Sequence, residues 1–498
     1  MHATGARLIR GDPMQVVTGV VSDSRLAIPG SLFVGLPGEH VDGGKYAQEA
    51  VRAGAVAVLV SEESSRQQRL GAELASRGVG ILAHEQPLTA LRRLAEFHRA
   101  AWNGTVVGIT GSVGKTTTRD LLSSVLAQRY RVLRPQENYN TEVGVALTLL
   151  RLTPRHEVAV LELAMRARGE IASLTSVARP EIGLLTRIAP AHLEYLGSIE
   201  NIARTKGELV EGLPPNGHAV LSYDDPYQRP MSQRTQASTL WYGFDSHADI
   251  TAEDIRPYGT GMRFTIRTPW EIIRDISLPL LGRHHVSDAL GAVAAAKLLG
   301  ISSGDVVAGL SHTERSAHRS HVVRTDSYLI LDDTYNASPA SVEAALASLA
   351  QLATDAASSE APDGTEATTT NGAQWRRVAI LGDMLELGEE SPRFHRQVGE
   401  EVTQSGVDLL IAVGPNSRAI AEGVRHSGLP QVHHFLNLDD FLKNGLSLLR
   451  CGDVILVKGS RAMGMEKLVE RLTDRVSKTE QAGAVNDENS PAHGGSDV

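Results

Sequence analysis

The residues best suited to chemistry form a glycine-rich turn between an apolar run at 105–110 and a helical pattern at 115–128. The turn consists of Thr110, Gly111, Ser112, Val113, Gly114, Lys115, Thr116 and Thr117. Glycines let backbone amides face phosphate oxygens, and the N-terminus of the helix adds a favourable dipole. Lys115 would then reach the β- and γ-phosphates of a nucleotide, and the Thr116 hydroxyl would coordinate Mg²⁺. This context predicts a phosphate-binding loop.

The turn departs from the full G-x-x-x-x-G-K-[ST] pattern, because Ile109 stands where the first glycine would fall. An ordinary glycine-rich turn between a strand and a helix is the alternative interpretation. Kinases, motors, GTPases and ligases share such loops, so the turn by itself names no reaction. The sequence has no N-K-x-D motif for reading a guanine base, which argues against a GTPase.

Polar groups follow two further apolar runs that are typical of buried strands, at 158–163 and 182–186. Glu162 closes the first run, and His192 comes soon after the second. A carboxylate at the carboxyl end of a parallel strand points into the ligand crevice of such a sheet. We therefore expect Glu162 near the phosphate loop, with a surface glutamate and a structural histidine as the plainer alternatives.

The composition excludes several classes of protein. The 498 residues indicate about three domains, and the net charge of −9 without a Lys/Arg-rich block argues against nucleic acid as a partner. The single cysteine, Cys451, excludes a disulfide within the chain and argues against a cysteine-based zinc site. Since the chain begins without an apolar signal core and contains no apolar run of about 18–20 residues, we expect a cytoplasmic protein without membrane insertion.

The pattern of elements predicts an α/β protein of three domains. The expected units are a small α/β domain at 1–100, a central P-loop domain at 101–318 with a doubly wound, mostly parallel sheet, and a Rossmann-like α/β domain at 319–476. Within the central domain, the alternating residues at 251–280 predict an antiparallel edge of the sheet. The polar stretch at 354–374 predicts a flexible insertion, and 477–498 a disordered tail.

Strings along nearly the whole chain, from about Ser22 to Leu472, resemble the Mur ligase family. They include Asp23-Ser24-Arg25, Glu137-Asn138-Tyr139-Asn140-Thr141, Gly282-Arg283-His284-His285, Asp332-Asp333-Thr334-Tyr335-Asn336, Gly382-Asp383-Met384-Leu385-Glu386 with His395, and Val457-Lys458-Gly459-Ser460-Arg461. The string that starts at Gly382 favours the branch of the family that adds D-alanyl-D-alanine.

The resemblance implies roles for particular residues. The implied metal ligands for Mg²⁺, of which two ions are expected, are Thr116, Glu162, His192 and Lys206. Lys206 would act as a carbamate, because CO₂ turns its amine into an anionic oxygen ligand of the kind that Mg²⁺ prefers. The implied ATP contacts are the loop 110–117 with Asp288, Asp333, Tyr335 and Asn336. The implied substrate contacts are Ser24, Asn140, Thr141, Asp383, Glu386 and Ser460. Lys115, Lys206, His192, Arg319 and Lys458 would form the catalytic set.

Plainer roles remain open for several of these residues. Ser24 could sit in a structural turn, Lys206 on a solvated helix face, and Asp383 and Glu386 at the cap of the next helix. Arg315 competes with Arg319 as the phosphate-contacting arginine. The chain also departs from the family pattern at four positions: Arg187, His285, Asp288 and Ser338. Asp288 lacks the amide donor of the family's asparagine, and Arg187 adds a cation close to the implied metal site.

The reaction that the resemblance implies is ATP-dependent amide formation. The γ-phosphate would activate a peptide carboxylate as an acyl phosphate, which the amine of D-alanyl-D-alanine would then attack. The implied acceptor is UDP-N-acetylmuramoyl-tripeptide, bound by the first domain, with ATP on the second and the dipeptide on the third. We expect a monomer. The alternatives are a related amide ligase of the folylpolyglutamate or cyanophycin type with another amino acid, and a degenerate relative that binds nucleotide without ligase activity.

Overall fold

The computed structural model describes residues 2–38, 41–67, 78–136, 139–314, 316–358, 375–425 and 431–474. Two compact units make up the chain. Unit 1 comprises Met1–Ile188, Ala203–Thr251 and Ala289–Gly309. Unit 2 comprises Ala189–Ile202, Ala252–Asp288 and Leu310–Val498. The stretch expected as a flexible insertion begins later than predicted, because residues 354–358 form the end of helix α12 (Pro339–Ser358). The rest of it, and the expected disordered tail, lie outside the described residues.

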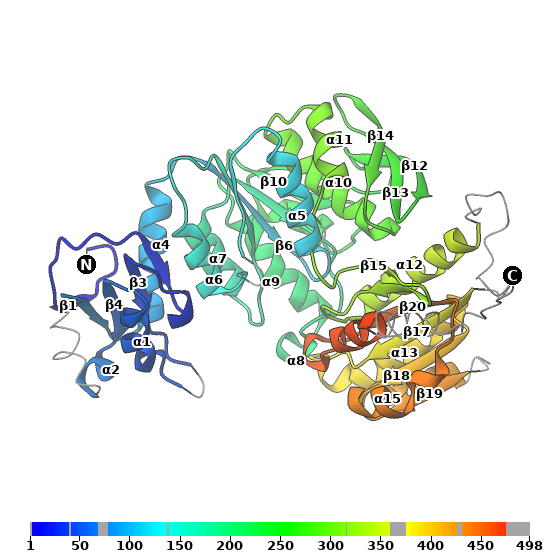
Figure 1. Cartoon of the computed structure of the whole chain (residues 1–498). Helices are drawn as coiled ribbons and strands as arrows, with labels where there is room; N and C mark the ends of the chain where they lie inside the picture. Colours follow the sequence, from blue (N-terminus) through cyan, green and yellow to red (C-terminus); the bar gives the residue numbers. More distant parts are fainter. Residues whose placement is uncertain are drawn as a thin grey trace, which may run out of the picture. The chain divides into compact units, whose positions relative to one another are not determined.

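Unit 1 begins with a five-stranded sheet in the order β1-β5-β4-β3-β2 (Figure 1). Its strands are β1 (Arg7–Arg10), β2 (Gly19–Val21), β3 (Ser31–Val34), β4 (Ala57–Ser61) and β5 (Gly80–His84), with helices α1 (Ala47–Arg52), α2 (Glu62–Gln67) and α4 (Pro87–Ala100). Only β1 runs antiparallel to its neighbour. Phe33, Val58 and Ile81 are buried in its core, as apolar runs bounded by turn residues predict.

The second sheet of unit 1 has six parallel strands in the order β11-β10-β9-β6-β8-β7. These strands are β6 (Thr105–Thr110), β7 (Val132–Leu133), β8 (Val158–Glu162), β9 (Ile182–Leu185), β10 (His218–Ser222) and β11 (Ser238–Tyr242). Ile109 pairs with Glu162, and Thr110 with Leu185. The carboxyl ends of β6, β8 and β9 therefore lie side by side, as the prediction of a parallel sheet required.

Helices connect these strands, as parallel pairing requires. The connecting helices are α5 (Lys115–Leu126), α6 (Glu142–Leu149), α7 (Glu170–Ala178), α8 (Leu193–Leu196) and α9 (Ile199–Glu211). Helices α10 (Arg283–Leu298) and α11 (Ser303–Ser311) follow all of these strands along the chain. The backbone of Gly309 in α11 approaches α5 closely, because a Cβ there would collide with the backbone of Val125. Ser124 also donates a hydrogen bond to the Gly309 carbonyl at 2.7 Å.

Unit 2 contains a six-stranded sheet in the order β15-β16-β20-β17-β18-β19. Its elements are β15 (His321–Arg324), β16 (Tyr328–Asp332), α12 (Pro339–Ser358), β17 (Arg376–Gly382), α13 (Ser391–Gln404), β18 (Leu409–Val413), α14 (Arg418–Arg425), β19 (Val432–Phe435), α15 (Leu438–Asn444) and β20 (Asp453–Lys458). Four of the five pairings are parallel, and β15 with β16 is antiparallel. The predicted Rossmann-like arrangement is confirmed.

One expectation about the sheets is wrong. Strands β12 (Thr251–Tyr258), β13 (Gly261–Arg267) and β14 (Ile272–Leu278) form a separate three-stranded sheet and not an edge of the parallel one. Short connections let each strand pair with the next along the chain, as β13 and β14 do in antiparallel register. Alternating burial along β14 gives this sheet one packed face.

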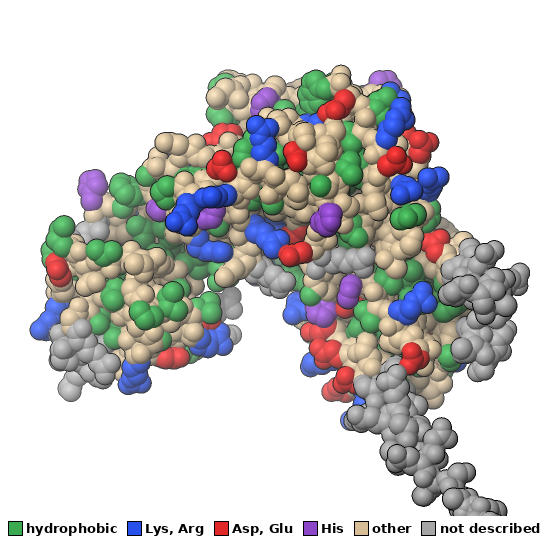
Figure 2. All heavy atoms as spheres, turned by 45° about the horizontal axis from the view of Figure 1, so that its top comes forward, with side chains coloured by type: hydrophobic (Ala, Val, Ile, Leu, Met, Phe, Trp, Pro, Cys, Tyr) green, Lys and Arg blue, Asp and Glu red, His purple; other side chains and the backbone are tan. Residues whose placement is uncertain are grey.

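The surface of the described chain is mixed in charge. Lys and Arg side chains are interspersed with Asp and Glu side chains on the face drawn in Figure 2. Among the described residues, no helix combines the length and the apolar character that a membrane crossing needs.

Candidate active site

The glycine-rich turn has the backbone that a phosphate loop needs. Gly114 lies at φ +91°, a left-handed conformation that side chains disfavour, and it directly precedes α5. Gly111 has no room for a side chain, because a Cβ there would collide with the Thr186 hydroxyl. The Lys115 ammonium lies across the turn and donates to the carbonyls of Gly111 at 2.9 Å and Ser112 at 3.3 Å.

Not every amide of this turn faces a ligand position. The N–H groups of Ser112 and Val113 donate to the carbonyl of Arg187, at 2.8 Å and 3.4 Å. The amides at the start of α5 lie at the positive end of the helix dipole, which suits them to phosphate oxygens. The side chain of Arg187 is exposed. This departure from the family pattern therefore supports the loop through its backbone carbonyl.

Glu162 lies at the carboxyl end of β8 and is only 4% exposed, so the surface-glutamate alternative is wrong. Its Oε2 accepts a hydrogen bond from the Thr116 hydroxyl at 2.9 Å, and its Oε1 accepts one from Asn140 Nδ2 at 3.0 Å. Arg119, one turn further along α5 than Thr116, places a guanidinium nitrogen 3.6 Å from Oε2. Three side chains from two segments thus orient one carboxylate.

Lys206 lies in α9 and is 1% exposed, which excludes the solvated-helix alternative. Burial lowers the pKa of its amine well below the usual value, the charge of Lys115 lowers it further, and Glu162 opposes the shift. A neutral amine is the nucleophilic form of lysine. The structure therefore brings together Lys115, Thr116, Glu162 and Lys206 as the sequence analysis expected.

Two supporting residues were missed because no motif marks them. Asp225 accepts the backbone N–H of Ile188 at 2.7 Å, and burial raises the pKa of this carboxyl. Gln228 is fully buried, donates to the Thr186 carbonyl at 2.7 Å and accepts from Ser222 N–H at 2.8 Å. Both hold the segment after β9 against which the phosphate loop packs.

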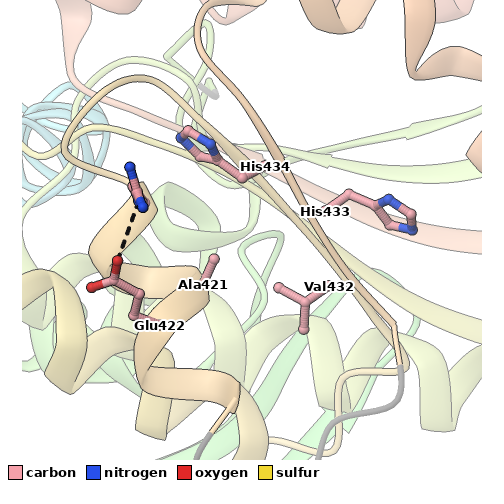
Figure 3. Close-up of a pocket in the computed structure, with 6 residues that line it drawn as sticks. Ala421, Glu422, Val432, His433 and His434 are labelled. Carbon is pink, nitrogen blue, oxygen red and sulfur yellow. Dashed lines mark ion pairs between the residues drawn. The ribbon is translucent and has the colours of Figure 1, made fainter.

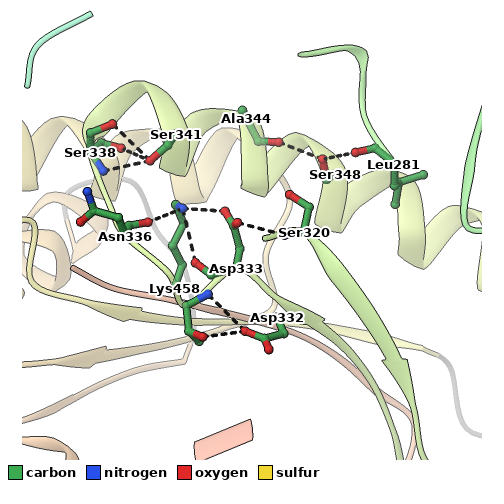
Figure 4. A network of polar contacts seen from close by, with 11 residues as sticks. Leu281, Ser320, Asp332, Asp333, Asn336, Ser338, Ser341, Ala344, Ser348 and Lys458 are labelled. Atoms are coloured by element: carbon green, nitrogen blue, oxygen red, sulfur yellow. Dashed lines mark hydrogen bonds and ion pairs between the residues drawn. The ribbon is translucent and has the colours of Figure 1, made fainter. Parts of the chain in front are cut away.

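In unit 2, a polar network joins the ends of β16 and β20 (Figure 4). Lys458, 2% exposed, donates to Asp333 Oδ2 at 2.5 Å and to the Asn336 carbonyl at 2.7 Å. The ammonium of Lys458 keeps the pKa of Asp333 below its usual value, although burial opposes this. Asp333 Oδ1 accepts the N–H of Ser320 at 3.0 Å, so the network also anchors the segment that carries Arg319.

The guanidinium of Arg319 stacks on the ring of Tyr335, 3.7 Å from its centroid, and that of Arg461 lies 5.9 Å from the same centroid. His318 and Ser320, on either side of Arg319, have positive φ, and His318 Nδ1 lies 2.9 Å from Asp332 Oδ2. This tight segment presents Arg319 beside the aromatic ring. Its competitor Arg315 lies outside the described residues.

The two histidines at the start of α10 lie against each other, with ring centroids 3.9 Å apart. Burial lowers the pKa of His284 to about 3 and that of His285 to about 4. Nδ1 of His285 lies 3.4 Å from Asp288, and its Nε2 is buried without a partner among the described atoms. The two substituted positions of the family pattern, His285 and Asp288, therefore contact each other.

Asp383 follows β17 and is buried. It accepts the N–H groups of Ser417 at 2.7 Å and Asn416 at 3.2 Å, just before α14. It therefore does not cap the next helix, α13. The Ser460 hydroxyl is also buried and accepts Leu385 N–H at 2.9 Å. These contacts tie the loop after β17 to the loop after β20.

Glu386 belongs to the same loop but contacts another segment. Its carboxylate Oε2 lies 2.5 Å from Nδ1 of His192. It does not cap α13 either. His192, expected as a metal ligand, thus lies in unit 2, and Thr116, Glu162 and Lys206 lie in unit 1.

The remaining residues expected at the site lie in a short 3₁₀ helix or directly before an α-helix. Ser24 is buried in a one-turn 3₁₀ helix, whose N-cap Asp23 accepts Arg25 N–H. Thr141 is exposed and precedes α6. Ser338 precedes Pro339 at the start of α12, where its N–H donates to Ser341 Oγ at 2.9 Å. The Ser341 hydroxyl therefore caps the start of α12, and the Ser338 hydroxyl donates to the same oxygen at 3.2 Å.

The residues of unit 1 suit Mg²⁺. Thr116 and Glu162 supply hard oxygen donors within hydrogen-bond distance of each other, and Mg²⁺ binds to one or two protein oxygens together with phosphates and waters. Among the described residues, no group of three or more His, Cys, Asp or Glu side chains could hold a metal. The amine of Lys206 adds an oxygen ligand only as a carbamate.

A pocket of about 380 Å³ lies elsewhere in unit 2, between α14 and β19 (Figure 3). Its lining includes Arg418 and Glu422, which form an ion pair at 3.3 Å, and His434, whose Nε2 donates to the Gly414 carbonyl at 2.8 Å. Because these polar groups form contacts with one another or with the backbone, we do not regard this pocket as a candidate active site.

Comparisons with known proteins agree with this geometry. The sequence matches the Mur ligase middle domain at residues 109–296, the Mur ligase glutamate ligase domain at 359–461, and the Mur ligase family catalytic domain at 16–99. It is 34% identical to the UDP-N-acetylmuramoyl-tripeptide–D-alanyl-D-alanine ligase of Bacillus subtilis, over 92% of this chain and 94% of that protein. The chain belongs to the Mur ligase family.

Further Mur ligases show the same likeness. The enzyme of the same name from Escherichia coli is 34% identical over 91% of this chain and 93% of its own. The crystal structure of MurF from Acinetobacter baumannii has a TM-score of 0.82 at 27% identity and covers 95% of this chain and 97% of that chain. MurF ligase from Thermotoga maritima in complex with ADP has a TM-score of 0.77 at 27% identity, covering 94% and 100%. The resemblance in the sequence motifs is thus confirmed at the level of the family and the fold.

Proposed function

We propose that this protein is an ATP-dependent ligase that joins D-alanyl-D-alanine to UDP-N-acetylmuramoyl-tripeptide, in the synthesis of a peptidoglycan precursor in the cytoplasm. The observation that carries the proposal is the convergence of Lys115, Thr116, Glu162 and Lys206 around one phosphate loop. Relatives about one-third identical over more than nine-tenths of the chain bear the name of this activity.

The proposed reaction needs charge neutralisation more than bond-making by the protein. An amide forms from a carboxylate only after activation, and the γ-phosphate of ATP supplies this as an acyl phosphate. Two anions, the peptide carboxylate and the γ-phosphate, must approach each other. Lys115 contributes a positive charge at the loop, and the first amides of α5 contribute oriented dipoles. The amine of the dipeptide then displaces phosphate.

Mg²⁺, when bound, would neutralise phosphate and carboxylate oxygens. In this proposal Thr116 and Glu162 hold one ion. His192 and the carbamate on Lys206 are the other two ligands. The buried, lowered-pKa amine of Lys206 supports carbamate formation, since only the neutral amine attacks CO₂. Arg319 and Lys458 complete the catalytic set, with Lys458 charge-compensated by Asp333.

We assign a binding role to each expected domain. Residues 1–100 would bind the UDP-sugar through Ser24, 101–318 would bind ATP and metal, and 319–476 would bind the dipeptide through Asp383 and Ser460. Asn140 and Thr141 would face the first substrate, while Asp288, Asp333, Tyr335 and Asn336 would contact the nucleotide. We further propose that the protein is a monomer.

The test is phosphate release by the full chain with UDP-N-acetylmuramoyl-tripeptide, ATP, Mg²⁺ and D-alanyl-D-alanine, with the product identified by mass. We expect release that requires all four components. Lys115→Ala should lower the rate at least about a hundredfold, because it removes a charge aimed at the transferring phosphate. Lys443→Ala, which alters an exposed lysine on α15, should retain the wild-type rate.

The same assay distinguishes the other candidates. Turnover with a single amino acid instead of the dipeptide would favour a ligase of different specificity. ATP binding without turnover would favour a degenerate relative. Wild-type activity in Lys115→Ala would contradict the proposed mechanism.

A further inference from the structure

Glu386 and His192 are joined by a short polar contact, although 194 positions separate them in the sequence. Oε2 of Glu386 lies 2.5 Å from Nδ1 of His192. A carboxylate oxygen can only accept a hydrogen bond, so Nδ1 is the protonated ring nitrogen in this contact. Both side chains are about one-third exposed or less, and both belong to unit 2.

The backbone of both residues is held in an unusual conformation. His192 has φ +56° and Glu386 has φ +62°, in the left-handed region that non-glycine residues rarely adopt. Such positions persist where the surroundings determine them, and they cluster at functional sites. Here the N–H of Glu194 donates to the Glu386 carbonyl at 3.3 Å. Gly388 also lies so close to Glu194 that a Cβ would come within 3.2 Å of its Cα.

The loop that carries Glu386 is fixed on its other side as well. Leu385 N–H donates to the Ser460 hydroxyl at 2.9 Å, and Ser460 N–H donates to the Asp383 carbonyl at 3.0 Å. The position of the Glu386 carboxylate is therefore set by the ends of β17 and β20. It reaches His192 from a rigid support and not from a loose surface loop.

We propose that Glu386 is a positioning residue for His192: its carboxylate holds the imidazole in one orientation with Nδ1 protonated, so that Nε2 is the ring nitrogen that would bind a metal. This inference rests on the proposed function, in which His192 is a metal ligand. Histidine ligands commonly donate their second ring N–H to a carboxylate, which fixes the tautomer and the ring orientation. Glu386 then acts through His192, whereas the family resemblance assigned it to the substrate.

Kinetics separate the two roles. If Glu386 positions His192, Glu386→Ala lowers kcat by about 10–100-fold and leaves the KM for D-alanyl-D-alanine unchanged. Glu386→Gln keeps an oxygen acceptor and should recover much of the rate. Glu389→Ala, at an exposed carboxylate on the same loop, is the matched control and should behave as wild type. A raised dipeptide KM with kcat retained would overturn the proposal in favour of a substrate contact.

A double-mutant cycle tests whether Glu386 acts through His192. Glu386→Ala should cause no further loss of rate in the His192→Asn background, because the group that it positions is already absent. Independent, additive losses would contradict a positioning role.

The ring itself provides a readout that does not depend on activity. In the full chain labelled with ¹⁵N-histidine and without substrates, the signal assigned by its loss in His192→Asn should show a protonated Nδ1. That state should persist in Glu389→Ala and disappear in Glu386→Ala. An unchanged ring signal in Glu386→Ala would overturn this inference even if the ligase activity is present. The opposite result is also informative. If the His192 ring responds to Glu386→Ala in a protein that has no ligase activity, the proposed function is wrong, and His192 then has no role as a metal ligand of the ligase.

Discussion

Lys206 is buried, although its place on a helix with polar positions would suggest a lysine that faces solvent. On a helix with alternating polar positions, a lysine is expected to face solvent, yet here the amine is buried beside Lys115 and Glu162. Burying a charged ammonium is costly, so the neutral amine is favoured. That chemical state, and not the motif alone, supports the proposed carbamate.

We predict that Lys206 carries CO₂. Wild-type protein equilibrated with ¹³C-bicarbonate should give a carbamate carbon signal by NMR, and Lys206→Met should lose it together with at least about a hundredfold of the ligase rate. Methionine has a similar volume and is apolar, so the fold should be retained. Lys443→Met serves as the control, since it makes the same substitution at an exposed lysine on α15. A carbamate signal that survives in Lys206→Met would place the carbamate elsewhere.

The departures from the family pattern also have physical explanations at this scale. Arg187 contributes its carbonyl to the amides of the phosphate loop and exposes its side chain. Ser338 donates its backbone N–H to the Ser341 hydroxyl at the start of α12. His285 and Asp288 lie against each other, so the two substituted positions form one contact. The motivation for a degenerate relative is weaker once these side chains are seen in place.

At the scale of elements, the strands that were predicted from apolar runs lie within one or two residues of the predicted bounds. The runs at 105–110 and 182–186 match β6 and β9, because buried parallel strands are almost continuously apolar. Pairing was harder to predict for β12–β14. Alternation of polar and apolar residues indicates a strand with one buried face, but it does not indicate which sheet the strand joins.

His395 shows how a helix supports a loop of the site. It is fully buried in α13, where Nδ1 donates to the Ser391 carbonyl at 2.7 Å and Nε2 accepts Met384 N–H at 3.0 Å. Both contacts require the neutral ring, and burial lowers its pKa below 6.5. His395 therefore fixes the loop that contains Asp383 and Glu386.

The two hydrogen bonds of the neutral His395 ring predict that the stability of the protein depends on pH. The unfolded chain binds a proton on this histidine below about pH 6.5, while the folded chain does so only at lower pH. The contribution to stability is thus complete above pH 6.5 and is lost as the pH falls below it, with a slope of at most about 1.4 kcal/mol per pH unit. Thermal melts between pH 7 and 5 should show a shallower decline in His395→Gln than in wild type. Equal slopes would contradict the assignment.

At the scale of the whole molecule, the likeness to Mur ligases extends over nearly the full chain, and the two six-stranded sheets have the predicted α/β arrangement. The carboxyl ends of their strands carry the candidate residues. A ligand that binds only the folded protein stabilises it by an amount that grows with the logarithm of the ligand concentration relative to Kd, so nucleotide binding should be visible in the melting of the entire protein.

We predict that a non-hydrolysable ATP analogue with Mg²⁺ raises the Tm by several degrees. At a hundredfold excess over Kd, the stabilisation is about 2.7 kcal/mol. The shift should be much smaller in Lys115→Ala and unchanged in Lys443→Ala, as measured by differential scanning fluorimetry. The same shift in all three proteins would place nucleotide binding outside the phosphate loop.

The sequence alone determined the α/β class, the phosphate loop, the family and most candidate residues, since glycine spacing, apolar periodicity and ordered motifs are local properties. The tertiary structure decided which partners these residues have. It buried Lys206, directed Ser112 and Val113 toward Arg187, neutralised Lys458 with Asp333, and joined Glu386 to His192. These are contacts between distant segments, and burial and charge pairing depend on which segments the sheets bring together, which no local pattern encodes.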